Sequence, residues 1–176
     1  SIVSFGQSLP IYADKSFIAN HFTSSNYKTI NENIIGAGKI YLSTINGIGS
    51  DDVRLSKRKG LSSRRLRGFQ KNKIGPVDGS DHIGGNYSAY ASLSSTIPNP
   101  IPDSWNAKSI IFLDTGNVWG VDFNDSLDSN KLRSSAGVSL EWVSPLGPLS
   151  ITLSETINKA DGDLEENFSF QIGSNF

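Results

Sequence analysis

Cysteine, methionine and long apolar runs are all missing from this sequence of 176 residues. Without cysteine, the chain forms no disulfide bond and no thiolate metal site. No apolar run approaches the roughly 20 residues of a transmembrane helix, so a membrane-spanning segment here must be a β-strand. The chain begins in a strand-like stretch with no methionine and no signal peptide, and we expect it to be the tail of a longer secreted chain.

What the sequence does contain is alternation of apolar and polar residues. From Ser134 to Trp142 the even positions are mostly apolar and the odd positions are small or polar, and from Leu149 to Ile157 the phases swap. The segment Pro145 to Pro148 between them is a tight turn. Period two over neighbouring segments predicts a sheet whose two faces meet different media. A soluble sheet needs a second layer over its apolar face, whereas a membrane barrel turns that face to lipid and its polar face to the lumen.

Composition favours the membrane barrel only modestly. The 17 glycines, the three tryptophans and the mean hydropathy of -0.26 fit a barrel with a wet lumen, and they also fit a soluble sandwich. The net charge of -1 indicates no particular partner.

Eight segments have strand character and none is a convincing helix, which predicts an all-β, antiparallel fold. The predicted strands lie near 1–12, 16–28, 33–48, 84–98, 107–119, 132–144, 148–158 and 166–176. The connections are unequal. The connections at 14–15, 95–107 and 145–148 are mostly short. The connections at 26–33, 120–131 and 158–165 are polar and flexible by composition. Short turns on one side of the sheet and long loops on the other are typical of outer-membrane barrels.

The last predicted strand, 166–176, has one apolar face and one polar face. Its apolar residues occupy even positions: Phe168, Phe170, Ile172 and Phe176. Its length matches the roughly 9–11 residues of a tilted transmembrane strand. Gly173 is its only glycine and falls in the lumen-facing series, where a missing side chain permits a bend. We therefore expect regular pairing with the preceding strand through Gln171 and poor pairing of the last four residues with the first strand of a barrel.

The longest connection, 49–83, has thirty-five residues without strand periodicity. Loops of this length are usually functional or disordered. It holds nine of the sixteen basic residues: Arg54, Lys57, Arg58, Lys59, Arg64, Arg65, Arg67, Lys71 and Lys73. A solvated charged loop explains most of them, and attraction to anionic lipid headgroups is a second explanation. Nucleic-acid binding requires interleaved aromatic residues, and Phe69 alone is present, so we expect no nucleic-acid partner.

No set of residues predicts catalysis or metal binding. His21 and His82 have no metal-ligand spacing around them, His21 has no assignable carboxylate partner, and no serine sits in a recognisable nucleophile elbow. Glu141 and Arg133 lie on the polar face of one strand, where we expect them to be part of the lumen wall. The tryptophans Trp105, Trp119 and Trp142 are expected at membrane interfaces or strand ends. We therefore predict no enzyme activity, no cofactor and no metal.

Several strings, in order along the chain, resemble the BamA family of outer-membrane-protein assembly factors, which belongs to the bacterial surface antigen superfamily. They are Leu66-Arg67-Gly68-Phe69-Gln70, Ile74-Gly75-Pro76, Gly84-Gly85-Asn86, Phe112 to Trp119, Ser135 to Val138, Trp142 to Leu149, Asp161-Gly162-Asp163 and the closing aromatic. The resemblance is specific from Leu66 to Phe176, whereas the residues before Leu66 match only in strand pattern. It implies a barrel of sixteen strands preceded by soluble periplasmic repeats. The whole chain, 1–176, would then be the C-terminal half of that barrel, its last eight strands.

The resemblance also implies a site in the lumen. The 49–83 loop would fold back into the barrel, where Arg67 would meet Asp114 with Phe69 packed nearby. The residues support this independently, because Gly68 allows a sharp loop tip and Gly116 shares one strand face with Asp114. A carboxylate facing lipid is costly, so Asp114 belongs on the lumen side. The alternatives without a functional role are that Arg67 is one more exposed arginine and that Asp114 only begins a turn.

A second acid is often present in the family on the neighbouring strand, at the position that matches Ser94. Here that residue is a serine. The resemblance therefore leaves open whether a second acidic contact to Arg67 exists.

Three functions remain open. The first is an assembly factor that folds and inserts β-barrel proteins through a weakly closed seam, the second is a secretion pore of the same superfamily, and the third is an autonomous eight-stranded barrel. We favour the first because of Gln70, Ile74-Gly75-Pro76 and Gly84-Gly85-Asn86. The implied partners are the N-terminal half of the barrel, periplasmic repeats, accessory assembly lipoproteins, unfolded outer-membrane proteins, and lipid with lipopolysaccharide. Phe176 resembles the terminal aromatic by which outer-membrane proteins are themselves recognised.

Overall fold

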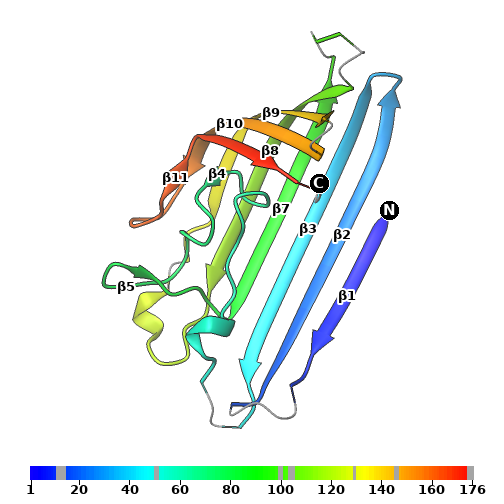
Figure 1. Ribbon diagram of the computed structural model, residues 1–176. Coiled ribbons are helices and arrows are strands. Elements are labelled where there is room, and N and C mark those ends of the chain that lie inside the picture. The colour runs from blue at the N-terminus through cyan, green and yellow to red at the C-terminus, as the bar shows by residue number, and fades with distance from the viewer. Residues whose placement is uncertain are drawn as a thin grey trace.

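Eight strands form one antiparallel sheet in which successive strands of the sheet are neighbours (Figure 1). The structure is a computed structural model that describes residues 1–10, 15–49, 52–98, 101–102, 106–128, 130–144 and 147–173. The strands of the sheet, in spatial order, are β1 (Ile2–Ser8), β2 (Phe17–Asn31), β3 (Ile34–Gly47), β7 (Tyr87–Ile97), β8 (Ala107–Trp119), β9 (Arg133–Ser144), β10 (Gly147–Asn158) and β12 (Phe168–Ile172). The predicted all-β, antiparallel fold is confirmed.

The sheet is open, because β1 and β12 are its two edges and do not pair with each other. The structure thus does not support an autonomous eight-stranded barrel, which requires the first and last strands to pair. No helix in the described ranges is long and apolar enough to cross a membrane.

Alternation sorts the side chains of each strand onto two faces. On β8, Phe112, Asp114 and Val118 are buried, whereas the odd-numbered Ile111 and Leu113 are exposed. The same division holds on β9 and β10, where buried serines alternate with exposed apolar residues such as Val138 and Leu153. The inner face is covered by chain folded onto it, and the outer face carries the exposed apolar side chains. This is the distribution of a lumen wall and a lipid-facing wall.

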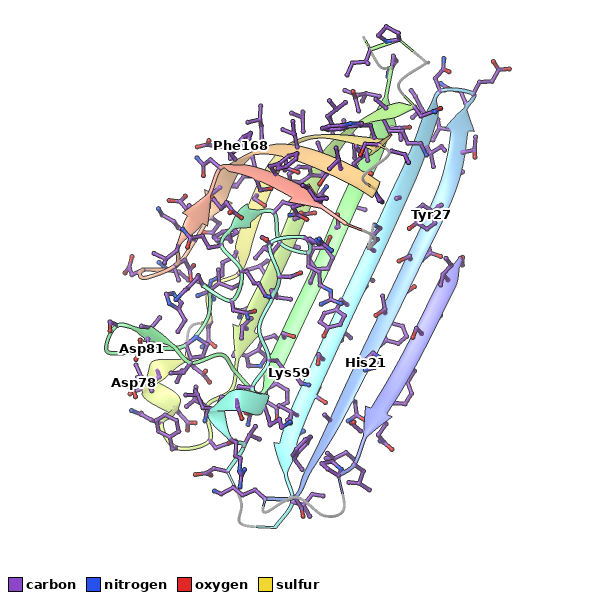
Figure 2. The ribbon with its side chains drawn as sticks, in the orientation of Figure 1. His21, Tyr27, Lys59, Asp78, Asp81 and Phe168 are labelled. Carbon is purple, nitrogen blue, oxygen red and sulfur yellow. The ribbon has the colours of Figure 1, made fainter. Side chains whose placement is uncertain are left out.

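The connection between β3 and β7, residues 48–86, lies against the inner face of the sheet, and we call it the motif loop (Figure 1). It contains a 3₁₀ turn, η1 (Leu55–Lys57), and three two-residue strands, β4 (Gly68–Phe69), β5 (Val77–Asp78) and β6 (Asp81–His82). Asp78 and Asp81 mark the outer end of the hairpin formed by β5 and β6 (Figure 2). The loop is therefore an ordered plug, although its sequence has no strand period.

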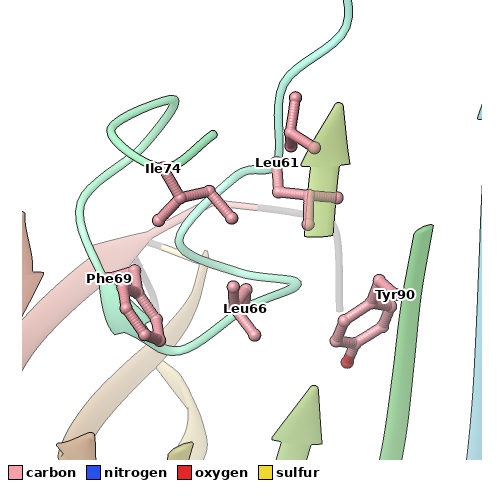
Figure 3. Close-up of a cluster of buried hydrophobic side chains, with 6 residues drawn as sticks. Leu61, Leu66, Phe69, Ile74 and Tyr90 are labelled. Atoms are coloured by element: carbon pink, nitrogen blue, oxygen red, sulfur yellow. The ribbon is translucent and has the colours of Figure 1, made fainter. Parts of the chain in front are cut away.

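Apolar residues of the motif loop form a core with the inner face of the sheet (Figure 3). Leu61, Leu66, Phe69 and Ile74 of the loop pack with Tyr90 of β7 and Val118 of β8. A second cluster joins Val53 of the loop to Phe17, Ala19 and Ile45 at the ends of β2 and β3. Burial of these side chains stabilises the loop position by the hydrophobic effect, at about 1.5–3 kcal/mol for each fully buried large side chain.

The connections differ in length, but the sequence placed two of them wrongly. Residues 26–33 were expected to be a flexible connection, whereas β2 continues to Asn31 and joins β3 through Glu32 and Asn33 alone. The connection between β1 and β2, which was expected as a short turn at 14–15, joins these strands at the same end of the sheet as the motif loop (Figure 1). Pairing between β2 and β3, rather than local composition, sets the extent of β2.

The last strand is shorter than the sequence predicted. Strand β12 spans Phe168–Ile172, and Glu166 belongs to a separate short strand, β11 (Glu165–Glu166), that pairs with β4. The reason is a competition for backbone partners, in which β4 takes residues that alternation alone assigns to the sheet. Residues 174–176, including Phe176, lie outside the described residues, as does Trp105.

Candidate functional site: a buried arginine clamp

Arg67 of the motif loop forms a bidentate ion pair with Asp114 on the inner face of β8, and we call this pair the clamp. The Nε atom of Arg67 lies 2.7 Å from Oδ2 of Asp114, and a terminal guanidinium nitrogen lies 2.9 Å from Oδ1. The backbone N–H of Arg67 also donates to Oδ2, at 3.3 Å. The Asp114 side chain is fully buried and that of Arg67 is 14% exposed. Two parallel charge-assisted hydrogen bonds fix the orientation of the guanidinium as well as its position.

The carboxylate of Asp114 is held by a serine from the neighbouring strand. Ser92 of β7 faces Asp114 directly in the antiparallel register, and its hydroxyl donates to Oδ1 at 2.6 Å. The guanidinium of Arg67 donates to the same hydroxyl at 3.3 Å. Ser94, the position examined in the sequence, pairs instead with Phe112. A neutral serine thus occupies the place beside the clamp on β7, a contact that the sequence did not indicate.

An aromatic ring stacks against the guanidinium of Arg67. The centre of the Arg67 guanidinium lies 3.5 Å from the ring centroid of Phe112, a cation–π contact. Phe112 pairs across the sheet with Gly137 of β9, and a side chain at Gly137 would meet the Phe112 ring at 2.8 Å and the Leu153 carbonyl at 2.2 Å. The absence of a side chain at Gly137 therefore makes room for the ring on which Arg67 stacks.

Gly68 permits the turn that presents Arg67. Its φ is +89°, in the left-handed region that favours glycine, and a Cβ there would stand 2.9 Å from the Cβ of Ser135. The Ser135 hydroxyl donates to the carbonyl of Arg67, which holds the loop on β9. Gly116 makes comparable room on β8, since a Cβ there would meet Leu61 at 2.9 Å. Phe69, next in the chain, is 1% exposed in the core cluster.

A second bidentate ion pair lies on the inner face and was missed in the sequence. Arg133 of β9 donates from Nε to Asp163 at 2.8 Å and from a terminal nitrogen at 2.9 Å, and both side chains are fully buried. Arg133 also donates to the carbonyl of Lys131. Both residues were visible, Arg133 on a polar strand face and Asp163 in a quoted motif, but nothing in the sequence paired them.

The resemblance noted in the sequence agrees with three comparisons. The model of the Omp85 superfamily domain matches residues 2–176. The chain belongs to the Omp85 superfamily. It is 29% identical to an outer membrane protein assembly factor BamA from Neorickettsia risticii, in an alignment 185 residues long that covers 99% of the chain. It is also 29% identical to one from Neisseria meningitidis, in an alignment 147 residues long that covers 66% of the chain.

A solved structure supports the same assignment for this Omp85 chain. The crystal structure of BamA from Haemophilus ducreyi lacking POTRA domains 1–3 superposes with a TM-score of 0.84, at 30% identity over 96% of the chain. The chain spans only 24% and 18% of the two curated relatives and 37% of that crystal structure. Members of the family are integral proteins of the Gram-negative outer membrane, and this chain shares that location.

The final strand of the Omp85 chain has the orientation that alternation indicated. Phe168, Phe170 and Ile172 are exposed on the outer face, where Figure 2 shows Phe168. The β10–β12 ladder is regular from Phe168 to Ile172. At Gly173 the φ becomes +122°, although its N–H still donates to the carbonyl of Pro148 at 3.0 Å. The backbone therefore leaves the extended conformation at the glycine that the sequence singled out, and the pairing predicted for the last four residues stays a prediction because residues 174–176 lie outside the described residues.

The other titratable side chains that the structure describes make isolated contacts. Among the described residues, no group of three or more His, Asp or Glu side chains could hold a metal ion. His82 contacts the carbonyl of Gly162 at 3.0 Å, and His21 stands on β2 (Figure 2). Lys159 donates a hydrogen bond to Glu165, which lowers the pKa of that carboxyl. Because Glu165 is exposed, this pair contributes little to stability.

Proposed function

We propose that this chain is the C-terminal half of the barrel of an outer-membrane assembly factor that folds and inserts β-barrel proteins through a lateral seam. The observation that carries the proposal is the similarity to BamA over 99% of the chain, in which β12 is a lipid-facing strand that pairs with β10 alone among the described strands. A free strand edge is a template for pairing with another strand, and so it requires no cofactor. We accordingly propose a non-enzymatic activity.

The architecture proposed here supplies the missing partners. An N-terminal half with eight further strands would pair with β1 on one side and meet β12 on the other, which would make a barrel of sixteen strands. Periplasmic repeats would precede it. Accessory lipoproteins and unfolded outer-membrane proteins are further proposed partners. Lipid and lipopolysaccharide complete them, because exposed basic residues of the motif loop such as Lys57 and Lys71 are suited to phosphate groups.

In this mechanism the clamp of Arg67 and Asp114 keeps the motif loop in the lumen. A loop held there braces β7, β8 and β9 together, because Ser92, Asp114 and Ser135 all bind Arg67. The seam lies farther along the sheet, at the edge of β12 that does not pair with β10. The wall would stay rigid while the edge opens, so that incoming strands add to β12 and not elsewhere.

A secretion pore of the same superfamily is the alternative, and the seam distinguishes the two. A pore passes its substrate through the lumen, whereas the proposed factor needs the seam to open. In the full-length protein, a cysteine replacing Ser169 in β12 and a second one on the facing residue of the first barrel strand would lock the seam. This chain contributes no competing cysteine.

Locking should leave a folded barrel that no longer assembles outer-membrane proteins, and reduction should restore activity. The readout is assembly of a heat-modifiable reporter barrel in cells or proteoliposomes. Each single-cysteine variant, oxidised in the same way, is the control. Full activity of the oxidised protein would contradict the seam mechanism and favour the pore.

A further inference from the structure

The connection between β10 and β12, residues 159–167, touches the motif loop through β11, which lies beside β4 (Figure 1), and we call it the hairpin tip. Its strand β11 pairs with β4, with Glu165 opposite Phe69 and Glu166 opposite Gly68. The backbone N–H of Gln70 donates to the carbonyl of Leu164 at 2.9 Å. The hairpin tip thus contacts the loop directly beside Arg67, and the chain continues from the tip into β12.

Two short strands do not hold each other in water, because a two-stranded pair of this length is marginal at best. The hairpin tip must therefore be held by something else. The candidate is the ion pair of Arg133 and Asp163, both fully buried. Asp163 also accepts the N–H of Ala160 at 2.6 Å, so that its carboxylate organises the tip while it binds β9.

The geometry of Arg133 fits a fixed anchor. Nε and one terminal nitrogen of Arg133 donate to the two carboxylate oxygens of Asp163. The other terminal nitrogen donates to the carbonyl of Lys131 at 2.8 Å and to the side chain of Asn117. All three guanidinium nitrogens have partners within the fold. A neighbouring ion pair of the tip, Lys159 with Glu165, is exposed and has no such environment.

We propose that Arg133 and Asp163 are positioning residues that dock the hairpin tip in the lumen and, through the β11–β4 pair, couple the seam strand β12 to the Arg67 clamp. A second contact acts in the same sense at the far end of β12, where Arg64 of the motif loop donates to Gln171 at 2.7 Å. Loss of the docked tip leaves the clamp formed but separates it from β12. The coupling to activity rests on the proposed function, whereas the docking does not.

Cysteine cross-linking in the full-length protein measures docking without reference to activity. Gln70→Cys and Leu164→Cys place two cysteines on residues joined by a backbone hydrogen bond directly beside the β4–β11 pair, and any cysteine outside this chain is replaced by serine. The variants to compare in this background are Asp163→Asn and the neutral double variant Arg133→Gln/Asp163→Asn. The double variant leaves no buried charge unpaired, so it should keep the heat-modifiable barrel. Lys159→Ala, which removes the exposed pair of the same segment, is the matched control.

We expect disulfide formation to slow by about tenfold or more in both Asp163 variants, because the buried anchor is lost, and to be unchanged in Lys159→Ala. Assembly activity should fall together with the cross-linking rate. Forming the disulfide in the neutral double variant should restore it, since the covalent bond replaces the anchor.

Unchanged cross-linking in the neutral double variant would overturn the docking role, and so would equal slowing in Lys159→Ala. Slow cross-linking with normal activity would overturn the coupling to β12. If the seam-locking experiment fails while the cross-linking result holds, the proposed function is wrong and the docking role stands.

Discussion

At the scale of single residues, burial decides which charged contacts matter in this protein. Asp114 is fully removed from solvent and is bound by Arg67 and Ser92. Lys159 and Glu165 make an ion pair that is half exposed on the lysine side. A buried carboxylate that loses its cation keeps its desolvation penalty, whereas an exposed one is solvated by water. Only the first kind of pair can hold a loop in place.

The clamp pair should therefore behave as a unit in mutational analysis. Arg67→Ala and Asp114→Ala should each destabilise the full-length barrel by about 3–5 kcal/mol, because each leaves one charge uncompensated. The double variant should cost little more than either single variant. Urea unfolding monitored by heat modifiability on gels gives the three values. Additive losses would mean that the two residues contribute independently of their contact.

Gly68 permits a comparison of backbone strain with crowding. Gly68 and Gly79 both have positive φ in the motif loop, at +89° and +62°, but a Cβ at Gly68 meets Ser135 whereas one at Gly79 meets nothing within 4 Å. Gly79→Ala should cost about 1–2 kcal/mol of backbone strain alone. Gly68→Ala should cost roughly 1–3 kcal/mol more through the clash with β9. Unfolding midpoints of the two variants measure the difference, and equal costs would show that Ser135 moves aside freely.

At the scale of the elements, the strands of the sheet follow from the sequence and the motif loop does not. Period-two alternation depends only on which face meets which medium, so it located β8 and β9 within a residue or two. The ends of β2 and β12 were wrong because pairing with distant segments decides them. The loop has no period, since its order comes from Leu61, Phe69 and Ile74 packing on β7 and β8.

The same distinction explains what was visible of the site. Arg67 and Asp114 came from a family resemblance, with strand parity as support for Asp114. Ser92 was missed because only the register between β7 and β8 places it opposite Asp114. Arg133 and Asp163 are thirty residues apart, and a pairing across an inward-folded tip leaves no local signal. One usable signal was an arginine in a lumen-facing series, which requires an acid in a partly closed interior.

Packing of the loop can be tested as an element. Phe69→Ala removes a side chain that is 1% exposed and should destabilise the motif loop by about 3–5 kcal/mol. Leu55→Ala, in the same loop but 62% exposed, is the control and should have little effect. Limited proteolysis of the full-length protein in detergent reports loop release through cleavage at its basic residues. Equal protection of both variants would show that the clamp alone holds the loop.

At the scale of the whole molecule, the sheet has more surface to cover than this chain provides. The outer face presents exposed apolar side chains from every strand of the sheet, which lipid would cover. The inner face is covered by the motif loop over β7 to β10 (Figure 1), and far less over β1 and β2. Both edges carry unpaired backbone groups. A second half-barrel would meet all of these needs together.

The isolated chain of 176 residues should therefore not form a stable, closed monomer. Closing eight strands would give an interior that side chains alone fill, and the motif loop already occupies that space. With the sheet open, β1 and β12 remain edges that pair with other copies and aggregate. Refolding in detergent, followed by light scattering and gel heat modifiability, should show mixed oligomers without a compact band. Supplying the N-terminal half of the barrel as a separate chain should convert them to a single heat-modifiable species. A monodisperse, heat-modifiable monomer from this chain alone would instead mean that the eight strands close by expelling the motif loop.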